Sequence, residues 1–391
     1  MLRSLYSGIS GLRSHQEMLD VTGNNIANVN TVGFKSSSTV FQDTLSQMTQ
    51  GAGGPQTGIG GTNPAQIGLG VQVAGVSTNF AQGSAQATGK ATDLMISGDG
   101  FFVTRLGNDT VYSRAGAFDF DADGRLVSAD GKIVQGYPAT NGVVNQGGQL
   151  GDIVLPLDAA APATRTTTAT VTGNLPSETA VGGTRVREST VFDASGTKQT
   201  LTLTYTRTAT GWSVAGTDGQ GGTGTGTLTF GADGKLTAGG SLTVGGIVVD
   251  MTQLSGFATL DTSSIASQNG KAAGTLQGYS IAKDGTVVGT FSNGASLAIG
   301  RIALATFANP AGLEKTGASG YRATANSGQA TVGAPGDPGV GQLASGTLEM
   351  SNVDLSQEFT NLIVAQRGFQ ANARIITTSD EVLQELTNLK R

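Results

Sequence analysis

The chain ends in Ser351–Arg391, SNVDLSQEFTNLIVAQRGFQANARIITTSDEVLQELTNLKR, which has no proline and one glycine in a sequence with 61 glycines. Apolar residues recur along it at spacings of three, four and seven, the a/d pattern of a helix with one apolar seam. The seam consists of Leu355, Phe359, Leu362, Phe369, Ala373, Ile376 and Leu383. Ser351 and Asp354 resemble a capping box, so we expect a helix from Asp354 to Leu389. One helix cannot bury such a seam against itself, and the sequence therefore predicts a partner.

The opposite end of the chain carries a matching pattern. Its apolar positions are Leu2, Leu5, Ile9, Leu12, Leu19 and Ile26, followed by turn-rich, polar sequence. Two interpretations remain open: a terminal hairpin packed on one globular domain, or assembly helices whose seams other copies of the chain complete. On the second interpretation, the assembly interface is formed by Leu5, Ile9, Leu12, Leu19, Ile26, Leu355, Phe359, Leu362, Phe369, Ile376 and Leu383.

Composition excludes several classes of function. The 391 residues carry a net charge of −5 and no Lys/Arg cluster interleaved with aromatics, so we expect no nucleic-acid partner. Cysteine is absent, which excludes disulfides, thiolate metal sites and cysteine nucleophiles. No apolar run is long enough to span a membrane, and the start of the chain lacks the pattern of a cleaved secretory signal. An extracellular protein of this sequence would be exported with its N-terminus retained.

Between the two helical patterns the sequence is typical of strands and tight turns. Asp-Gly pairs recur from residue 99 to residue 285, as in hairpin turns. Residues 164–257 alternate almost strictly between apolar and polar residues, with a Gly-rich run, Gly216 to Gly226, expected to be an exposed loop. The style of the earlier block returns near Gly278. The sequence therefore predicts a mainly β protein with terminal α-helices and one β-domain inserted into another.

These shifts in pattern define the expected domains. Residues 1–30 and 351–391 form a paired, coiled-coil-like helical assembly domain. Residues 31–70 and 335–350 are connecting segments, 71–145 and 275–334 form the first β-domain, and 146–274 form the inserted outer β-domain. Such nesting keeps the two ends of the chain together, in agreement with a shared seam.

No constellation of residues indicates catalysis. Residues 119–130 match several positions of an EF-hand loop, but the flanking residues alternate like strands, which favours a solvent-facing hairpin over a calcium site. His15, the only histidine, lies within a predicted seam, which favours an ordinary helix-surface residue over a catalytic base. Trp212 is interpreted as a core residue rather than a carbohydrate contact. We therefore expect no enzyme activity, no cofactor and no catalytic, cofactor-binding or metal-ligating residue.

Four stretches resemble the rod and hook proteins of the bacterial flagellum. Residues 19–35, LDVTGNNIANVNTVGFK, are similar to a sequence shared by these subunits, and four asparagines in residues 24–30 predict an ordered, non-helical turn. Residues 93–102 resemble their first β-domain, and residues 351–354 and 365–370 resemble their C-terminal helix. The family signature is carried by Asn24, Asn25, Ala27, Asn28, Gly33 and Phe34. The inserted β-domain favours the hook type, because distal rod subunits are shorter and lack it.

The resemblance implies a structural subunit of the flagellar hook, which polymerises into a curved, flexible tube and acts as a universal joint between motor and filament. It implies as partners further copies of the chain, the rod, hook-cap and hook–filament junction proteins, and the flagellar type III export apparatus. It also implies an extracellular location in the hook region, with no nucleic acid and no membrane as a partner. The alternatives are a distal rod-type axial protein and a non-flagellar extracellular adhesin.

Overall fold

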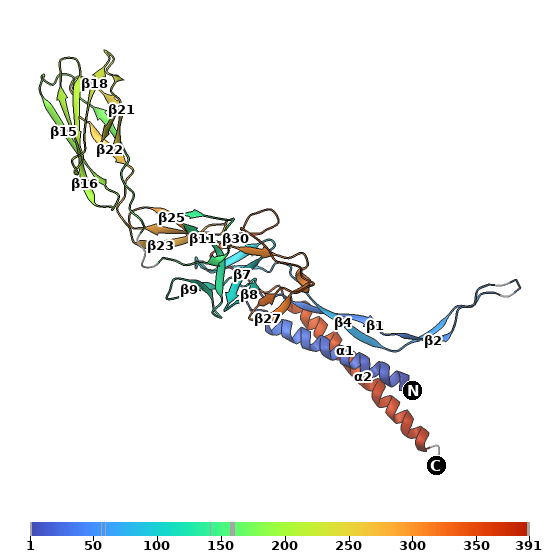
Figure 1. Cartoon of the computed structure of the whole chain (residues 1–391). Coiled ribbons are helices and arrows are strands. Elements are labelled where there is room, and N and C mark those ends of the chain that lie inside the picture. Colours follow the sequence, from blue (N-terminus) through green and yellow to red (C-terminus); the bar gives the residue numbers. More distant parts are fainter. Residues whose placement is uncertain (1, 56, 59, 141, 157–160, 389–391) are drawn as a thin grey trace. The chain divides into compact units, whose positions relative to one another are not determined.

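A computed structural model describes residues 2–55, 57–58, 60–140, 142–156 and 161–388. It is mainly β with one helix near each end of the chain, as the sequence predicted (Figure 1). The chain divides into two compact units. The first comprises Met1–Leu155, Ser280–Val288 and Ala298–Arg391, and the second comprises Pro156–Tyr279 and Gly289–Leu297.

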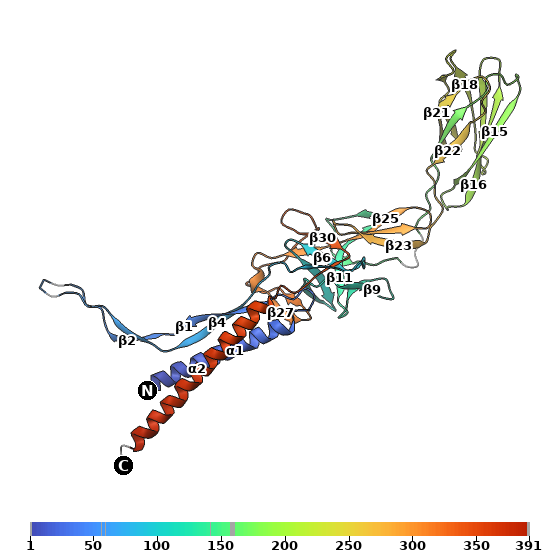
Figure 2. The same ribbon diagram turned by 180° about the vertical axis from the view of Figure 1, so that it is seen from behind.

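The two long helices lie side by side in the first unit, as Figures 1 and 2 both show. Helix α1 spans Leu2–Ala27 and α2 spans Leu355–Asn388; the predicted end at Leu389 lies outside the described residues. Asp354 is the N-cap of α2, because its Oδ1 accepts hydrogen bonds from the amides of Ser356 (2.8 Å) and Gln357 (3.3 Å). The predicted capping box with Ser351 at the N-cap is therefore wrong: the capping side chain lies three residues later.

A long two-stranded ribbon follows α1. It consists of β1 (Ser37–Asp43) paired with β4 (Val71–Thr78), and of β2 (Ser46–Gln50) paired with β3 (Ala65–Gly68). The Oγ of Ser10 accepts a hydrogen bond from the amide of Val71 (3.2 Å), so the first residue of β4 lies against α1. Residues 71–78, which the sequence boundaries place in the first β-domain, belong to this ribbon instead.

The β-part of the first unit is built on a mixed-length antiparallel sheet. Its strands follow the order β25-β11-β7-β8-β28-β27, and β23 and β24 extend it beyond β25. The bounds are β7 Phe101–Leu106, β8 Asp109–Ser113, β11 Ile133–Thr140, β23 Leu276–Ile281, β24 Thr286–Phe291, β25 Ser296–Ile302, β27 Glu314–Gly317 and β28 Gly320–Arg322.

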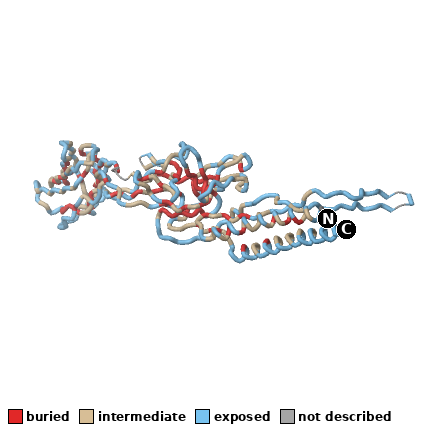
Figure 3. Tube along the Cα trace, turned by 90° about the horizontal axis from the view of Figure 1, so that it is seen from below, coloured by how far each residue is buried: buried red, intermediate tan, exposed pale blue. Residues whose placement is uncertain are grey.

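Shorter strands complete this unit. They are β5 Ala85–Ala87, β6 Leu94–Ser97, β9 Phe118–Phe120, β10 Leu126–Ser128, β12 Val143–Val144, β13 Gly151–Asp152, β26 Leu304–Thr306, β29 Thr331–Gly333, β30 Gln342–Ser345 and β31 Thr347–Glu349, with a 3-10 turn at Pro310–Gly312. Strands β30 and β31 pair with β6 and β5, which brings the segment before α2 onto the β-part. Figure 3 shows the buried residues gathered in the β-parts rather than along the helices.

The segment that matches several positions of an EF-hand loop, residues 119–130, lies largely in the β9–β10 hairpin. Leu126 pairs with Phe120, and the Asp121 carboxylate accepts bonds from the Arg125 amide and the Arg125 Nε, each at 2.8 Å. These contacts hold the pKa of Asp121 below its usual value despite desolvation. The carboxylate is thus used by the turn itself, and the hairpin interpretation is confirmed.

The second unit packs two sheets face to face. One has the order β15-β16-β17-β18-β19 and the other β20-β21-β14-β22. The bounds are β14 Thr168–Asn174, β15 Thr184–Phe192, β16 Lys198–Arg207, β17 Trp212–Thr217, β18 Thr223–Phe230, β19 Leu236–Ala238, β20 Ser241–Val244, β21 Ile247–Ser255 and β22 Ser264–Gln268.

Trp212 lies in the core between these sheets, 1% exposed, which confirms its predicted role. The run from Gly216 to Gly226 is an exposed loop only at residues 218–222, because the rest of it belongs to β17 and β18. A Cβ on Gly216 would lie 2.4 Å from Val244 Cγ2, and one on Gly224 would lie 2.2 Å from the Thr243 carbonyl oxygen. Glycine therefore permits the close approach of β20, a reason for its use that composition alone does not reveal.

Candidate assembly site

Glycines on both helices lie in the contact between α1 and α2. A Cβ built on Gly368 of α2 would lie 2.5 Å from the His15 ring of α1, and one on Gly11 would lie 2.7 Å from Asn372 Oδ1. Gly8 is close to Ile376, whose Cγ1 would be 3.5 Å from a Cβ there. His15 thus packs between the helices, and the expectation that it is a surface residue is wrong. The three glycines leave room for the facing helix at these positions, and none of them was among the predicted apolar seam residues.

The predicted seam residues divide into two groups. Half-buried members are Leu5, Leu12, Leu19, Ile26, Leu362, Phe369 and Ile376. Exposed members are Ile9, Leu355, Phe359 and Leu383. Further exposed apolar side chains on α2 are Ile363, Val364, Ile375, Val382 and Leu386. We call the exposed seam members and these further exposed side chains together the uncovered face of the helix pair. The described part of the chain leaves all of them open to solvent.

Asn25, predicted only as part of a family signature, joins three elements. Its Nδ2 donates to the Ser37 carbonyl (2.7 Å) and to Glu358 Oε1 (3.1 Å), and its Oδ1 accepts from the Ser37 amide (3.0 Å). Asn25 is 1% exposed, so these bonds satisfy the whole buried amide. One side chain therefore ties α1, β1 and α2 together.

The other asparagines shape the end of α1. Asn24 and Asn25 are helical, since α1 runs to Ala27, so the predicted non-helical turn starts later than expected. Asn24 and Ala27 are exposed. Asn28 Nδ2 donates to the Asn24 carbonyl (2.9 Å), and Asn28 Oδ1 accepts from the Thr31 hydroxyl (3.0 Å). These local bonds tie the turn after α1 to the last turn of the helix.

Gly33 and Phe34 pack the chain onto the β-part after this turn. Gly33 is left-handed (φ +66°), and a Cβ there would lie 2.4 Å from the Ala115 amide nitrogen. Its own amide donates to the Glu349 carbonyl (2.8 Å). The Phe34 ring lies under the Lys315 ammonium, 5.4 Å from the ring centroid.

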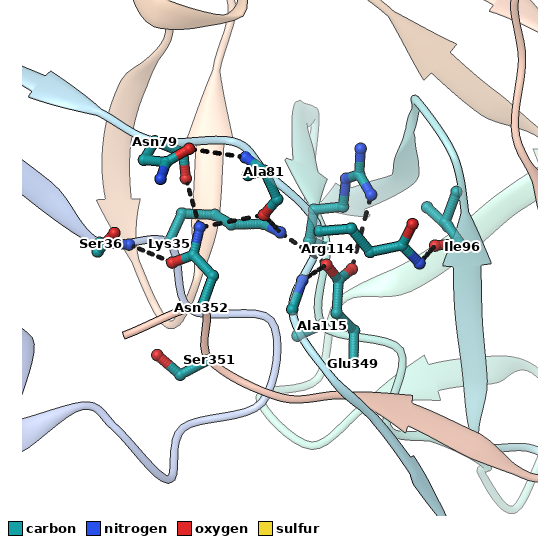
Figure 4. Close-up of polar contacts among 12 residues, drawn as sticks. Lys35, Ser36, Asn79, Ala81, Ile96, Arg114, Ala115, Glu349, Ser351 and Asn352 are labelled. Carbon is teal, nitrogen blue, oxygen red and sulfur yellow. Dashed lines mark hydrogen bonds and ion pairs between the residues drawn. The ribbon is translucent and has the colours of Figure 1, made fainter. Parts of the chain in front are cut away.

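A buried ion cluster lies beside this turn, and sequence reasoning missed it. Lys35 Nζ is 2.6 Å from Glu349 Oε1, and Arg114 Nη1 is 3.6 Å from Glu349 Oε2. The three side chains are 0%, 0% and 3% exposed for Lys35, Glu349 and Arg114, and Figure 4 shows the two cations converging on one carboxylate. Burial lowers the pKa of Lys35, an effect that Glu349 opposes. In the sequence, Lys35 and Glu349 are single charged residues far apart in the chain. Such residues are too common to indicate an ion pair.

Asn352 fastens the segment before α2 to the same place. Its Nδ2 donates to the carbonyls of Asn79 (2.8 Å) and Ala81 (3.0 Å), and its Oδ1 accepts from the Ser36 amide (2.8 Å) (Figure 4). The beginning and the end of the chain are thus bonded to each other where the helix pair meets the β-part.

Comparisons with known proteins match these same regions. The model "Flagella basal body rod protein" matches residues 5–35, "Flagellar hook protein FlgE/F/G D1 domain" matches 95–172, and "Flagellar basal body rod FlgEFG protein C-terminal" matches 344–389. The flagellar hook protein FlgE of Borreliella burgdorferi is 39% identical, and that of Treponema pallidum is 38% identical, with both chains covered in full in each case. The chain belongs to the flagellar hook protein family.

A rod protein is also similar. The flagellar basal-body rod protein FlgG of Bacillus subtilis is 37% identical over the whole of both chains. The two hook relatives named above align in full at 39% and 38% identity, against 37% for this rod protein, and the comparisons favour the hook over the rod-type alternative. Among solved structures, the Helicobacter pylori flagellar hook protein FlgE2 aligns with a TM-score of 0.48 and 14% identity, over 68% of this chain and all of that one.

Membership of the hook family makes this chain a structural subunit of the bacterial flagellum. The family models cover α1 with its following turn, part of the β-structure, and α2 with the segment before it. The bonds of Asn25, Gly33 and Asn352 lie inside or next to these regions. Within the described ranges no helix is long and apolar enough to cross a membrane.

Proposed function

We propose that the chain polymerises into the flagellar hook through the uncovered face of its helix pair. Each copy supplies α1 and α2 to an inner tube, and other copies cover the apolar side chains that a single chain leaves exposed. Residues 1–30 and 351–391 act as the assembly domain. Among the predicted interface residues, from Leu5 to Leu383, the half-buried ones hold the two helices together and the exposed ones contact neighbouring copies.

The exposure of α2 carries this proposal. Phe359, Ile363 and Val364 are 53%, 56% and 55% exposed, although they lie on a helix whose partner is already present. Several large apolar side chains exposed on one helix are typical of a surface that another molecule covers. A second copy is the occupant that membership of a polymer-forming family supports.

The β-parts form the outer layers of the tube in this proposal. Residues 71–145 and 275–334, apart from the ribbon strand 71–78, serve as the first β-domain and residues 146–274 as the outer one, connected to the helices by residues 31–70 and 335–350. Exposed side chains on β15 and β18 include many threonines, whose contacts can shift without large losses of buried apolar area. Layers of this kind suit a flexible joint that bends while it transmits torque.

We infer that the further partners are flagellar as well: the rod, hook-cap and hook–filament junction proteins, and the type III export apparatus. A cysteine-free chain suits passage through a narrow channel in the unfolded state, followed by assembly outside the cell. The role is structural rather than catalytic. In support, the single histidine is packed between helices and Asp121 is engaged by its own turn.

Replacing Phe359 with Asp tests the proposal. The carboxylate would be buried without a partner at each subunit contact, at a cost of several kcal/mol, so we expect polymer yield to fall at least about tenfold. The measurement is sedimentation and electron microscopy of polymer formed by purified protein, with circular dichroism to show that the monomer is folded.

Thr360→Asp is the matched control, because Thr360 is also exposed and adjoins Phe359. It adds the same charge outside the apolar set, and we expect polymers of normal yield. Normal polymers from Phe359→Asp would show that this face is not the interface.

A further inference from the structure

The buried cluster of Lys35, Arg114 and Glu349 gathers three distant parts of the sequence. Lys35 follows the turn after α1, Arg114 follows β8 in the β-part, and Glu349 ends β31, shortly before α2. All three lie in the first unit. Burying three charges is costly, so the arrangement needs a reason beyond stability alone.

The Glu349 carboxylate is divided between two sets of partners. Oε1 accepts from Lys35 Nζ (2.6 Å) and from the Gly83 amide (2.9 Å). Oε2 faces Arg114 Nη1 at 3.6 Å, and the Arg114 guanidinium lies over the Phe101 ring, 5.3 Å from its centroid. Phe101 belongs to the apolar core of the β-part. Lys35, in the segment that leads from α1, and the Gly83 amide therefore share Oε1, whereas Arg114 of the β-part faces Oε2 in an ion pair without a hydrogen bond.

We propose that Glu349 is a latch that locks the segment leading from α1 onto the β-part and thereby sets where the assembly helices leave it. Arg114 places a second buried cation beside the carboxylate, and Lys35 closes the latch through its hydrogen bond to Oε1. This inference rests on the proposed function only in naming the helices as assembly helices. The Gly33 amide also donates to the Glu349 carbonyl (2.8 Å), so Gly33 and Lys35 both bond the segment leading from α1 to Glu349.

The charges predict that loss of Lys35 and loss of Glu349 have unequal effects on the fold. Without Lys35, Glu349 and Arg114 remain a neutral pair. Glu349 Oε1 keeps the Gly83 amide, and the Ala81 carbonyl, which accepts from Lys35 Nζ (2.7 Å), keeps the Asn352 amide group (3.0 Å). Without Glu349, two buried cations are left with no shared carboxylate. Loss of Lys35 should thus open the latch selectively, whereas loss of Glu349 should also disturb the β-part.

Hydrogen exchange of the full-length soluble chain tests this. For Lys35→Met we expect amides of residues 28–37, including Gly33, to exchange at least about tenfold faster, while those of β7 and β8 stay as in the wild type. For Glu349→Gln we expect both regions to exchange faster. Lys90→Met is the matched control, since it removes an exposed ion pair with Asp119 (3.0 Å), and both regions should keep wild-type protection.

Two results would overturn the latch. One is wild-type protection of residues 28–37 in Lys35→Met. The other is an equal loss of protection in β7 and β8 for Lys35→Met and Glu349→Gln, which would make Lys35 a general core residue. Exchange is read without polymerisation, so failure of the latch and failure of the assembly face are seen in different experiments.

Discussion

At the scale of single residues, the turn after α1 depends on the missing side chain of Gly33. Replacement by alanine would combine a left-handed backbone with a Cβ 2.4 Å from the Ala115 amide nitrogen, which is backbone and cannot rotate away. We expect Gly33→Ala to lower the free energy of unfolding of the first unit by about 2 kcal/mol or more. Chemical denaturation followed by circular dichroism measures this.

Gly107 provides the control for that substitution. It has a similar backbone angle (φ +62°), but a Cβ there has no atom within 4 Å. Gly107→Ala should therefore cost only the backbone strain, about 1 kcal/mol. If the two variants were equally stable, the contact with Ala115 would not matter to the turn.

At the scale of elements, the α1–α2 contact depends on Gly368 rather than on large apolar side chains alone. Alanine favours helices over glycine, yet a Cβ on Gly368 would lie 2.5 Å from the His15 ring. We expect Gly368→Ala to destabilise the helix pair by about 1–3 kcal/mol through overpacking. Thermal melting of the helical circular dichroism signal measures the change.

Gly23 in α1 gives the opposite expectation. A Cβ there has no atom within 4 Å, so Gly23→Ala should raise helix stability by up to about 1 kcal/mol. A stabilising effect of Gly368→Ala equal to that of Gly23→Ala would contradict the close helix contact.

At the scale of the whole molecule, the two units have separate cores and separate spectroscopic probes. Trp212, the only tryptophan, is in the core of the second unit, and the two long helices are in the first. Leu201→Ala removes a fully buried side chain beside the tryptophan core and should cost about 2–5 kcal/mol. We expect the Trp212 fluorescence transition to shift to lower temperature while the helical signal melts as in the wild type. A common shift of both signals would show that the units unfold as one.

Sequence periodicity alone determined much of this architecture. The a/d pattern located both helices, and the alternation within residues 164–257 indicated strands such as β16, because these periods follow from how side chains alternate in helices and strands. Trp212 was assigned to a core because a domain poor in aromatics buries its largest side chain. The resemblance carried by Asn24, Asn25 and the segments around Phe102 and Asp354 identified the family.

Tertiary structure decided what covers each side chain. Periodicity marks which positions of α1 and α2 are apolar, but it does not show that Gly11 and Gly368 bring the helices together or that Phe359 is left exposed, since both depend on the path of the other helix. Lys35 and Glu349 are 314 residues apart, and no local pattern links them. Their pairing exists only because the fold brings three segments to one dry position, where a charge is stable only beside its counter-charge.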